Sequence, residues 1–225
     1  MIEVISATRK TEAEFWKDAA LGISFKRLTQ DDPRLVARVT FQNRTGLAEL
    51  FNARIRADDS NDILVFIHDD VWIDDYFFAD RILQGLATYD VIGVAGNRRR
   101  SINQPAWAFM DDKFTWDSKE YLSGRVAHGP YPFAPISVFG DVPAECELLD
   151  GIFLAARKST LRNHGVAFDP RFDFHFYDLD FCRSARSKGL RLGTWPICLT
   201  HQSGGAFNSP AWLEKLRVYR EKWGS

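Results

Sequence analysis

Short hydrophobic stretches alternate with amphipathic ones along the first two-thirds of the chain. Short apolar runs predict strands, whereas apolar residues that recur every third or fourth position predict helices. Alternation of this kind is typical of an α/β domain with a largely parallel sheet flanked by helices. The predicted elements are strand Ile2–Ala7, helix Thr11–Ala20, strands Ile23–Leu28 and Val36–Phe41, helix Gly46–Ala57, strand Ile63–Ile67, helix 74–87 and strand Val91–Ala95.

The run ILVFI at Ile63–Ile67 is the clearest strand of the sequence. It is uniformly apolar and too short for a helix with two faces, so we expect a central strand that is buried on both faces. The run stops abruptly at His68-Asp69-Asp70. These polar residues are therefore predicted at the carboxyl edge of the sheet, where open α/β sheets bind their ligands.

The pattern changes after Asn97. Residues 97–143 are rich in Pro, Trp, His and Gly and show no lasting periodicity. A structureless loop of that length is unusual in a compact domain, so the segment is expected to line a substrate site or to contain short strands. Regular structure returns at Leu148–Arg157. It is followed by helix Lys158–His164, helix Asp178–Lys188 with a stop at Gly189, strand Leu192–Leu199 and a terminal helix that begins at Ser209-Pro210.

Composition narrows the functional classes. The 225 residues are 45% hydrophobic and 26% charged, which predicts one globular domain over residues 1–225. A formal net charge of -1 gives no field that would attract nucleic acid. No apolar run approaches the roughly 20 residues of a transmembrane helix, and the first residues lack a signal peptide's apolar region, so we expect a cytoplasmic protein. Three cysteines without a CxxC pair favour buried free thiols.

The sequence His68-Asp69-Asp70 is the first candidate for chemistry. Adjacent carboxylates repel one another unless a cation stabilises them, and carboxylate oxygens suit Mg²⁺ or Mn²⁺ bound to phosphates. The alternative is a solvated turn in which an aspartate caps the next helix. The place of the motif at the end of the central strand favours the divalent cation.

Asp178 and Asp180 form a second candidate at the start of a predicted amphipathic helix. Side chains two positions apart on a helix point in different directions, so one carboxylate could face the crevice while the other caps the helix or pairs with Arg183 or Arg186. The alternative is that the helix dipole favours both acids there. A third candidate, His201, follows a strand; it could complete a mixed oxygen and nitrogen site on Mn²⁺, or be structural.

The three motifs, in this order, resemble those of the inverting GT-A glycosyltransferases of the family 2 type, which include bacterial rhamnosyl- and galactofuranosyl-like transferases. In such enzymes an Asp-x-Asp-like motif ends the fourth strand; the stretch ILVFIHDDV stands there, with Asp70 at the last acidic position and His68 where the first aspartate often is. The stretch 43–52 looks like the N-x-G-x-A-x-x-x-N helix start of the family. The stretch 150–157 looks like its D-G-x-x-x-x-x-R strand.

The same resemblance extends to the last third of the chain. Phe172 to Gly189 resembles the acidic catalytic-base segment, usually written Glu-Asp-x-Asp, with Tyr177 in place of the glutamate and Asp178 at the base position. His201 matches the late metal-ligand histidine of several relatives. The resemblance thus implies that Asp178 is the general base and that Asp70 and His201 bind Mn²⁺ or Mg²⁺.

Substrate contacts follow from the resemblance in the same way. Asp150 and Gly151 would lie near the donor sugar and the acceptor, and Trp107 offers an aromatic face to a sugar ring, with core packing as its alternative role. The residues implied in donor nucleotide binding come from the first strand, the stretch 43–52 and the acidic motif: Ser6, Thr8, Arg9, Asn43, Gly46, Asn52 and Asp69.

The implied activity is inverting transfer of a sugar from a nucleotide-diphosphate sugar to a glycan or lipid-linked acceptor, in bacterial cell-surface glycan synthesis. The terminal helix from Pro210 to Trp223 mixes basic residues with an apolar stripe, so it either packs on the core or docks on an anionic inner-membrane face. Two rival functions stay open. A sugar-phosphate nucleotidyltransferase usually has a G-x-G-T-R loop, which SATRKT lacks; a non-catalytic sugar- or nucleotide-binding module could share the fold.

Overall fold

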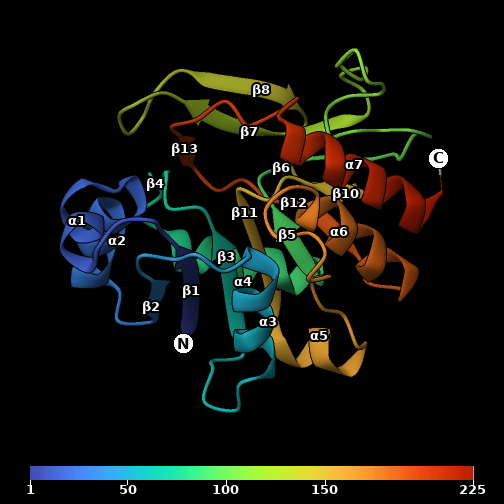
Figure 1. Ribbon diagram of the computed structural model, residues 1–225. Coiled ribbons are helices and arrows are strands. Elements are labelled where there is room, and N and C mark those ends of the chain that lie inside the picture. Colours follow the sequence, from blue (N-terminus) through green and yellow to red (C-terminus); the bar gives the residue numbers. More distant parts are fainter. Residues whose placement is uncertain (225) are drawn as a thin grey trace.

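Residues 1–224, which the computed structural model describes, form two sheets and seven helices (Figure 1). The larger sheet has seven strands, of which five run in one direction while β11 and β9 run in the opposite one. The predicted α/β class is confirmed, with a mixed sheet. The strands lie in the order β2 (Leu35–Thr40), β1 (Ile2–Ala7), β3 (Ile63–Ile67), β11 (Phe153–Arg157), β5 (Val91–Gly93), β12 (Leu192–Thr194) and β9 (Ala144–Cys146).

Helices cover both faces of this sheet, which explains why β3 is apolar throughout. Leu64 and Phe66 point into one core, whereas Val65 and Ile67 point into the other, so successive side chains are all buried. The first core is closed by α3 (Leu47–Arg56), α5 (Lys158–Asn163), α6 (Tyr177–Ser187) and α7 (Pro210–Trp223), and the second by α1 (Glu12–Asp18), α2 (Ala20–Asp31) and α4 (Phe78–Thr88) (Figure 1).

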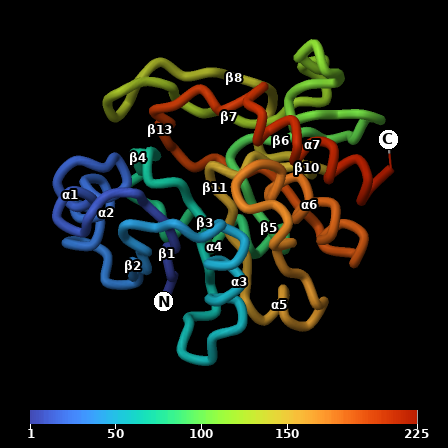
Figure 2. The backbone as a smooth tube through the Cα atoms, in the orientation of Figure 1, coloured from blue at the N-terminus to red at the C-terminus, as the bar shows by residue number. Residues whose placement is uncertain are grey.

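The smaller sheet lies above the larger one in the view of Figure 1 and holds much of the segment that lacked a pattern. Residues 97–143 contain short strands, which was one of the two alternatives that the sequence left open for this segment. The loop between β6 and β7 lies beside α7 (Figure 2). Arg220 of α7 forms an ion pair with Asp112 of this loop. The strands are β10 (Leu148–Leu149), β6 (Ala95–Asn97), β7 (Leu122–His128), β13 (Leu199–His201) and β4 (Val71–Ile73), with β8 (Ile136–Gly140) paired to β7.

One predicted strand is a helix, and the predicted strands Val91–Ala95 and Leu192–Leu199, like the regular stretch Leu148–Arg157, are each divided between the two sheets. The stretch Ile23–Leu28 belongs to helix α2, in which Phe25 and Leu28 are buried while Ile23 is 39% exposed, so the apolar period is that of a helix. The stretch Leu192–Leu199 is split between β12 and β13, which belong to different sheets. Pro196 lies between the two strands and has no N–H to continue a ladder. The helix predicted at 74–87 begins only at Phe78, as α4.

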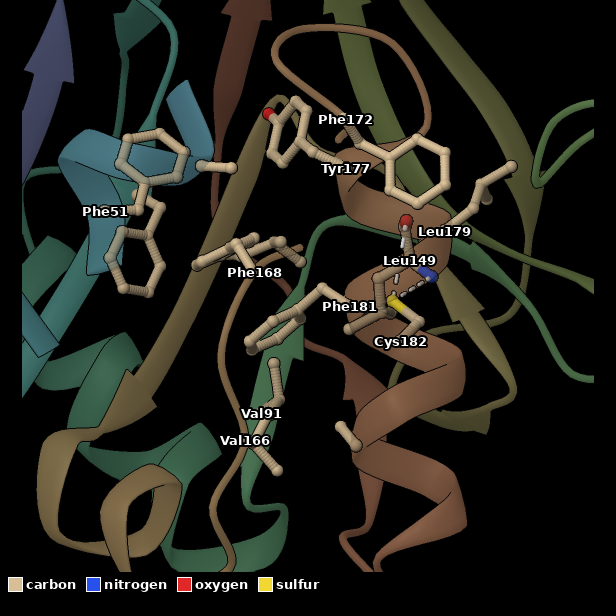
Figure 3. Close-up of a cluster of buried hydrophobic side chains, with 14 of the residues drawn as sticks. Phe51, Val91, Leu149, Val166, Phe168, Phe172, Tyr177, Leu179, Phe181 and Cys182 are labelled. Atoms are coloured by element: carbon tan, nitrogen blue, oxygen red, sulfur yellow. Dashed lines mark hydrogen bonds between the residues drawn. The ribbon is translucent and has the colours of Figure 1, made fainter. Parts of the chain in front are cut away.

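An aromatic cluster holds the chain segment that leads into α6. Phe168 lies between Phe51 and Phe181, with ring centroids 5.2 and 4.3 Å away (Figure 3). The side-chain amide of Asn52 donates to the carbonyl of Phe168 (2.7 Å) and accepts from its N–H (2.9 Å). Asn52 is buried, so this paired contact satisfies backbone groups that water does not reach.

Helix α7 begins as predicted, because the Ser209 hydroxyl accepts from the N–H of Trp212 (3.1 Å). Trp212, Leu216 and Tyr219 are buried in the first core, which accounts for the apolar stripe without a membrane. Its basic residues are also occupied: Lys222 lies 2.7 Å from Asp169 and 2.6 Å from Asp180. Packing on the core is therefore the role of α7 that the structure supports.

The burial of two of the three cysteines agrees with the sequence-based expectation. Cys146 and Cys182 are buried free thiols, as expected, whereas Cys198 is exposed. Within residues 1–224, no helix has both the length and the apolar character needed to cross a membrane.

Candidate active site

A cavity of about 630 Å³ opens at the carboxyl end of β3, where the sequence predicts the ligand crevice. Strand β11 runs antiparallel to β3 with Phe153 opposite Ile67, so the start of β11 lies beside the end of β3. The N–H of His68 donates to the carbonyl of Ile152 (3.2 Å) and continues this pairing. The cavity is lined by residues that follow β3, precede β11, begin α6 and end β13.

Three predicted or neighbouring residues meet at one side of this cavity. Strand β13 pairs with β4 so that His201 lies opposite Val71, which brings the imidazole to Asp70. His201 Nε2 is 3.3 Å from Asp70 Oδ2, and His68 Nδ1 is 4.0 Å from Asp70 Oδ1. The ligand atoms of His68, Asp70 and His201 all lie within 4.8 Å of one another, so the three could hold one metal ion. His68 thus joins the two ligands that the sequence singled out.

Burial and the contacts within this group shift the pKa of each of its three members. Burial raises the pKa of Asp70, but the hydrogen bond and positive charge of His201 outweigh burial and bring the pKa down to about 2. Burial lowers the pKa of His201, yet the bond to Asp70 prevails and the net shift is upward. Burial lowers the pKa of His68 and Asp70 opposes it less strongly, so that imidazole is more readily neutral. A neutral imidazole is the form that binds metals.

Tyr177 sets the orientation of the His68 ring. The Tyr177 hydroxyl donates to the carbonyl of Gly151 (2.7 Å) and lies 2.9 Å from His68 Nε2. A hydroxyl has one hydrogen, so His68 Nε2 must be the donor in this second contact. The lone pair of the neutral ring is then at Nδ1, on the side of Asp70. A hydrogen bond of this kind fixes the tautomer of a metal-binding histidine, so these residues fit a divalent cation.

Asp178 lines the same cavity and follows Tyr177 in the first turn of α6. Its Oδ2 accepts from the N–H of Gly151 (3.0 Å) at the start of α6. Burial raises the pKa of this carboxyl to about 7, the charge of Asp150 adds to the rise, and backbone N–H groups oppose it. A carboxyl with a pKa near neutrality can accept a proton under physiological conditions.

Asp180 points away from the cavity and is fully buried. It accepts from the indole N–H of Trp223 (2.7 Å) and lies 2.6 Å from the ammonium of Lys222. The expected separation of two environments is therefore seen, but the partner is a lysine of α7 and not Arg183 or Arg186. Arg186 forms ion pairs with two glutamates, Glu145 and Glu147.

Gly151, Asp150 and Trp107 all line the cavity. A Cβ at Gly151 would lie 2.5 Å from the Tyr177 hydroxyl and 2.9 Å from the Asp178 Cβ, so no side chain fits there. Asp150 accepts from the indole N–H of Trp107 (2.7 Å) and from the N–H of Ile152 (3.0 Å). Its carboxylate is thereby held between the irregular segment and β11.

Only one of the residues expected to bind the nucleotide lines the cavity. Asp69 lines the cavity, whereas its neighbours across the sheet edge, Ser6, Thr8 and Arg9, do not; Ala7 takes their place. Asn43 closes a turn by bonding both ways with Thr45. Gly46 precedes α3 and abuts Asp173, and Asn52 is committed to Phe168. The stretch 43–52 therefore has structural contacts, which the sequence pattern does not distinguish from nucleotide contacts.

His128 and Tyr177 are the lining residues that sequence reasoning undervalued. His128 ends β7, pairs its ring with the Ser137 hydroxyl (3.1 Å) and lies 6.1 Å from the His201 ring centroid. Its irregular segment was expected to line a substrate site. Tyr177 stood in the sequence only as a replacement for a glutamate. Its bond to His68 joins two residues far apart along the chain, so no local pattern announces it.

Comparison with known proteins identifies the fold. No family model matches the chain, and no curated protein matches it. GalNAc-T7, solved with UDP, GalNAc and Mn²⁺, superposes with a TM-score of 0.54 and 10% identity, over 99% of this chain and 48% of the other. A Drosophila β1,4-galactosyltransferase 7 mutant, solved with manganese, UDP-Gal and xylobiose, gives 0.51 and 12%, over 96% and 80%.

These identities are low, so the likeness concerns the fold. The chain has the GT-A glycosyltransferase fold, as the sequence motifs implied. It spans about half the length of the GalNAc-T7 chain that it matches.

Proposed function

We propose that the protein is a metal-dependent glycosyltransferase that moves a sugar from a nucleotide-diphosphate sugar to an acceptor hydroxyl, with inversion at the anomeric carbon. One observation carries the proposal: a carboxyl whose pKa is about 7, that of Asp178, shares a cavity with a group of three metal-binding side chains. The presence of UDP and manganese in two structures of the same fold supports the donor class.

In the proposed reaction, Asp178 accepts the proton of the acceptor hydroxyl while that oxygen attacks the anomeric carbon of the donor. The bond between the anomeric carbon and the diphosphate breaks, and attack from the opposite side inverts the configuration. A general base works best when its pKa lies near the working pH. Burial and the neighbouring Asp150 bring Asp178 to that range, and the Gly151 N–H holds its carboxylate in place.

His68, Asp70 and His201 would hold the divalent cation. Two imidazoles and one carboxylate suit Mn²⁺ better than Mg²⁺, because Mg²⁺ prefers oxygen ligands. When bound, the cation would balance the negative charge of the diphosphate leaving group. The low pKa of Asp70 keeps that carboxylate charged, and the bond from His68 to Tyr177 keeps Nδ1 free.

We assign the nucleotide to the side of the cavity formed by Asp69 and the end of β1, where Ala7 is a lining residue. The sequence resemblance extends the proposal to a family 2-like enzyme that builds bacterial cell-surface glycans on a glycan or lipid-linked acceptor.

A thermal-shift screen of UDP-, GDP-, dTDP- and CMP-sugars, with and without Mn²⁺, tests the donor and the metal together. A ligand at 100 times its Kd stabilises the native state by about 2.7 kcal/mol. We expect one nucleotide class to raise Tm only with Mn²⁺, and Asp70→Ala to abolish that shift. Asp31→Ala, which removes an exposed carboxylate outside the cavity, is the matched control.

Turnover separates an enzyme from a binding module of the same fold. We expect release of the nucleoside diphosphate from the donor that the screen identifies, in the presence of acceptor. Binding of that donor with no release under any acceptor would favour the non-catalytic alternative. Absence of any nucleotide-dependent shift would reject the proposal as a whole.

A further inference from the structure

The cavity is rich in carboxyl groups, of which Asp70 is paired with His201. Its lining includes four carboxylates, and no lysine or arginine among residues 1–224 lines it. Asp70 is paired with His201, whereas the charge of Asp150 acts on Asp178. A bound divalent cation would serve one anionic group, the diphosphate. A second anionic group in the cavity would meet carboxylates at close range. The four are Asp69, Asp70, Asp150 and Asp178.

Several aromatic side chains form part of the cavity wall. Trp116 stacks on Phe139, with ring centroids 6.0 Å apart and planes 15° apart, and Phe109 meets Trp116 edge to face at 5.0 Å. Phe207 packs against Phe109 at 5.5 Å from the segment after β13. Trp116 is 54% exposed and Phe207 is 41% exposed. Both residues line the cavity and keep exposed aromatic surface.

Trp107 connects this wall with the acidic side. Its ring meets Phe139 edge to face at 5.0 Å, and its indole N–H donates to Asp150 (2.7 Å). The charge of Asp150 in turn contributes to the raised pKa of Asp178. A ligand that packs on the aromatic wall therefore lies in the same cavity as the group that would accept its proton.

We propose that the acceptor is an uncharged carbohydrate whose apolar ring face packs on Trp116, and that the cavity excludes acceptors with a carboxylate or phosphate. This inference rests on the proposed function and names its acceptor class. The C–H face of a neutral sugar matches an exposed aromatic ring, whose negative face attracts C–H groups. A uronic acid or a sugar phosphate would bring its charge close to Asp150 and Asp178, in a lining whose described residues include no lysine or arginine.

The test uses pairs of methyl glycosides: methyl glucoside, galactoside, mannoside and xyloside, each hexoside beside its uronide and its 6-phosphate. Saturation-transfer NMR measures binding to the wild-type chain with Mn²⁺, and nucleoside diphosphate release measures turnover with the donor from the thermal-shift screen. We expect the neutral member of at least one set to be preferred over its charged partners by at least about tenfold in kcat/KM, and to be the only member that binds.

Variants of Trp116 test the aromatic contact. Trp116→Ala should raise the KM for the neutral glycoside about three- to tenfold, whereas Trp116→Phe should retain most of the affinity because it keeps an aromatic face. Tyr131→Ala removes an aromatic side chain of similar exposure (56%) outside the cavity lining and should leave KM unchanged. Donor affinity, measured by calorimetry, should be the same in all three variants.

Each outcome bears on one proposal. Equal use or equal binding of a charged glycoside and its neutral partner would overturn the inference while leaving glycosyl transfer intact. So would an unchanged KM in Trp116→Ala. Absence of donor binding with any nucleotide would remove the proposed function. The NMR comparison of neutral and charged glycosides would still decide which class the cavity accepts.

Discussion

Two carboxyl groups of one cavity have pKa values that shift in opposite directions. On the side of β3, the pKa of Asp70 falls to about 2, although burial raises it, because His201 donates to the carboxylate and carries positive charge. On the side of α6, burial raises the pKa of Asp178 to about 7 and the charge of Asp150 raises it further. Burial raises the pKa in both places: His201 reverses that effect at Asp70, whereas the charge of Asp150 adds to it at Asp178.

The difference suits two chemical tasks that a single environment could not combine. A carboxylate that binds a metal must stay charged at physiological pH, which a low pKa ensures. A general base must exchange a proton near pH 7, which a low pKa prevents. The comparison between the two sides is therefore a hypothesis about function, and the following experiments test it in order of expected effect.

Asp178→Asn should have the largest effect. The change keeps the size of the side chain but removes its basicity, so turnover should fall by about 10²- to 10⁴-fold while donor affinity is nearly unchanged. Steady-state kinetics with calorimetry of the donor measures both. Asp180→Asn is the matched control. If Asp178→Asn turned over normally and a folded Asp180→Asn were dead, the two assignments would be reversed.

Tyr177→Phe tests the metal side with a smaller expected effect. Loss of the hydroxyl removes the partner of His68 Nε2 but keeps the aromatic packing of the first core. Partners of this kind are typically worth about 10- to 100-fold in metal affinity. Titration of Mn²⁺ by electron paramagnetic resonance measures the change. Unaltered Mn²⁺ affinity would show that the tautomer of His68 is set without Tyr177.

The pH profile of the wild type gives the third test. Since the base must be unprotonated, kcat/KM should fall about tenfold per pH unit below pH 7 and level off above it. The free energy of unfolding should fall as pH rises, because the pKa of Asp178 increases from 3.8 to about 7 on folding. The stability present at acid pH is therefore lost as pH rises through 7. Asp178→Asn should then raise Tm at pH 8 and not at pH 4, as calorimetric scans can check.

Asp180→Asn should have the smallest effect on turnover and act on stability. Its carboxylate loses the ion pair with Lys222 (2.6 Å), and Lys222 keeps Asp169 as a partner (2.7 Å). We expect a loss of about 1–3 kcal/mol in the free energy of unfolding by urea titration, with kcat within about threefold of wild type. A variant as stable as the wild type would mean that the buried pair contributes specificity and not stability.

Local patterns anticipated those parts of the molecule whose neighbours are close in sequence. The apolar run of β3 reported that both its faces are covered, and Ser209-Pro210 marked the start of α7. The left-handed φ of Gly189 (+83°) agrees with its place as a helix stop. The strand assigned to Ile23–Leu28 failed because six residues with mixed polarity fit two periods, and packing on the second core selected the helix.

The residues of the site could be named from the sequence, but their partners could not. Asp70, His201 and Asp178 were marked by type and by position at the ends of elements. Their pKa values, the third candidate ligand His68 and its contact with Tyr177 depend on strands and helices that only folding brings together. Asn52 shows the converse, since a residue in a binding pattern was committed to Phe168. Periodicity reports which face of an element is buried; which side chains meet depends on strand register and helix placement, because those contacts join residues that are distant along the chain.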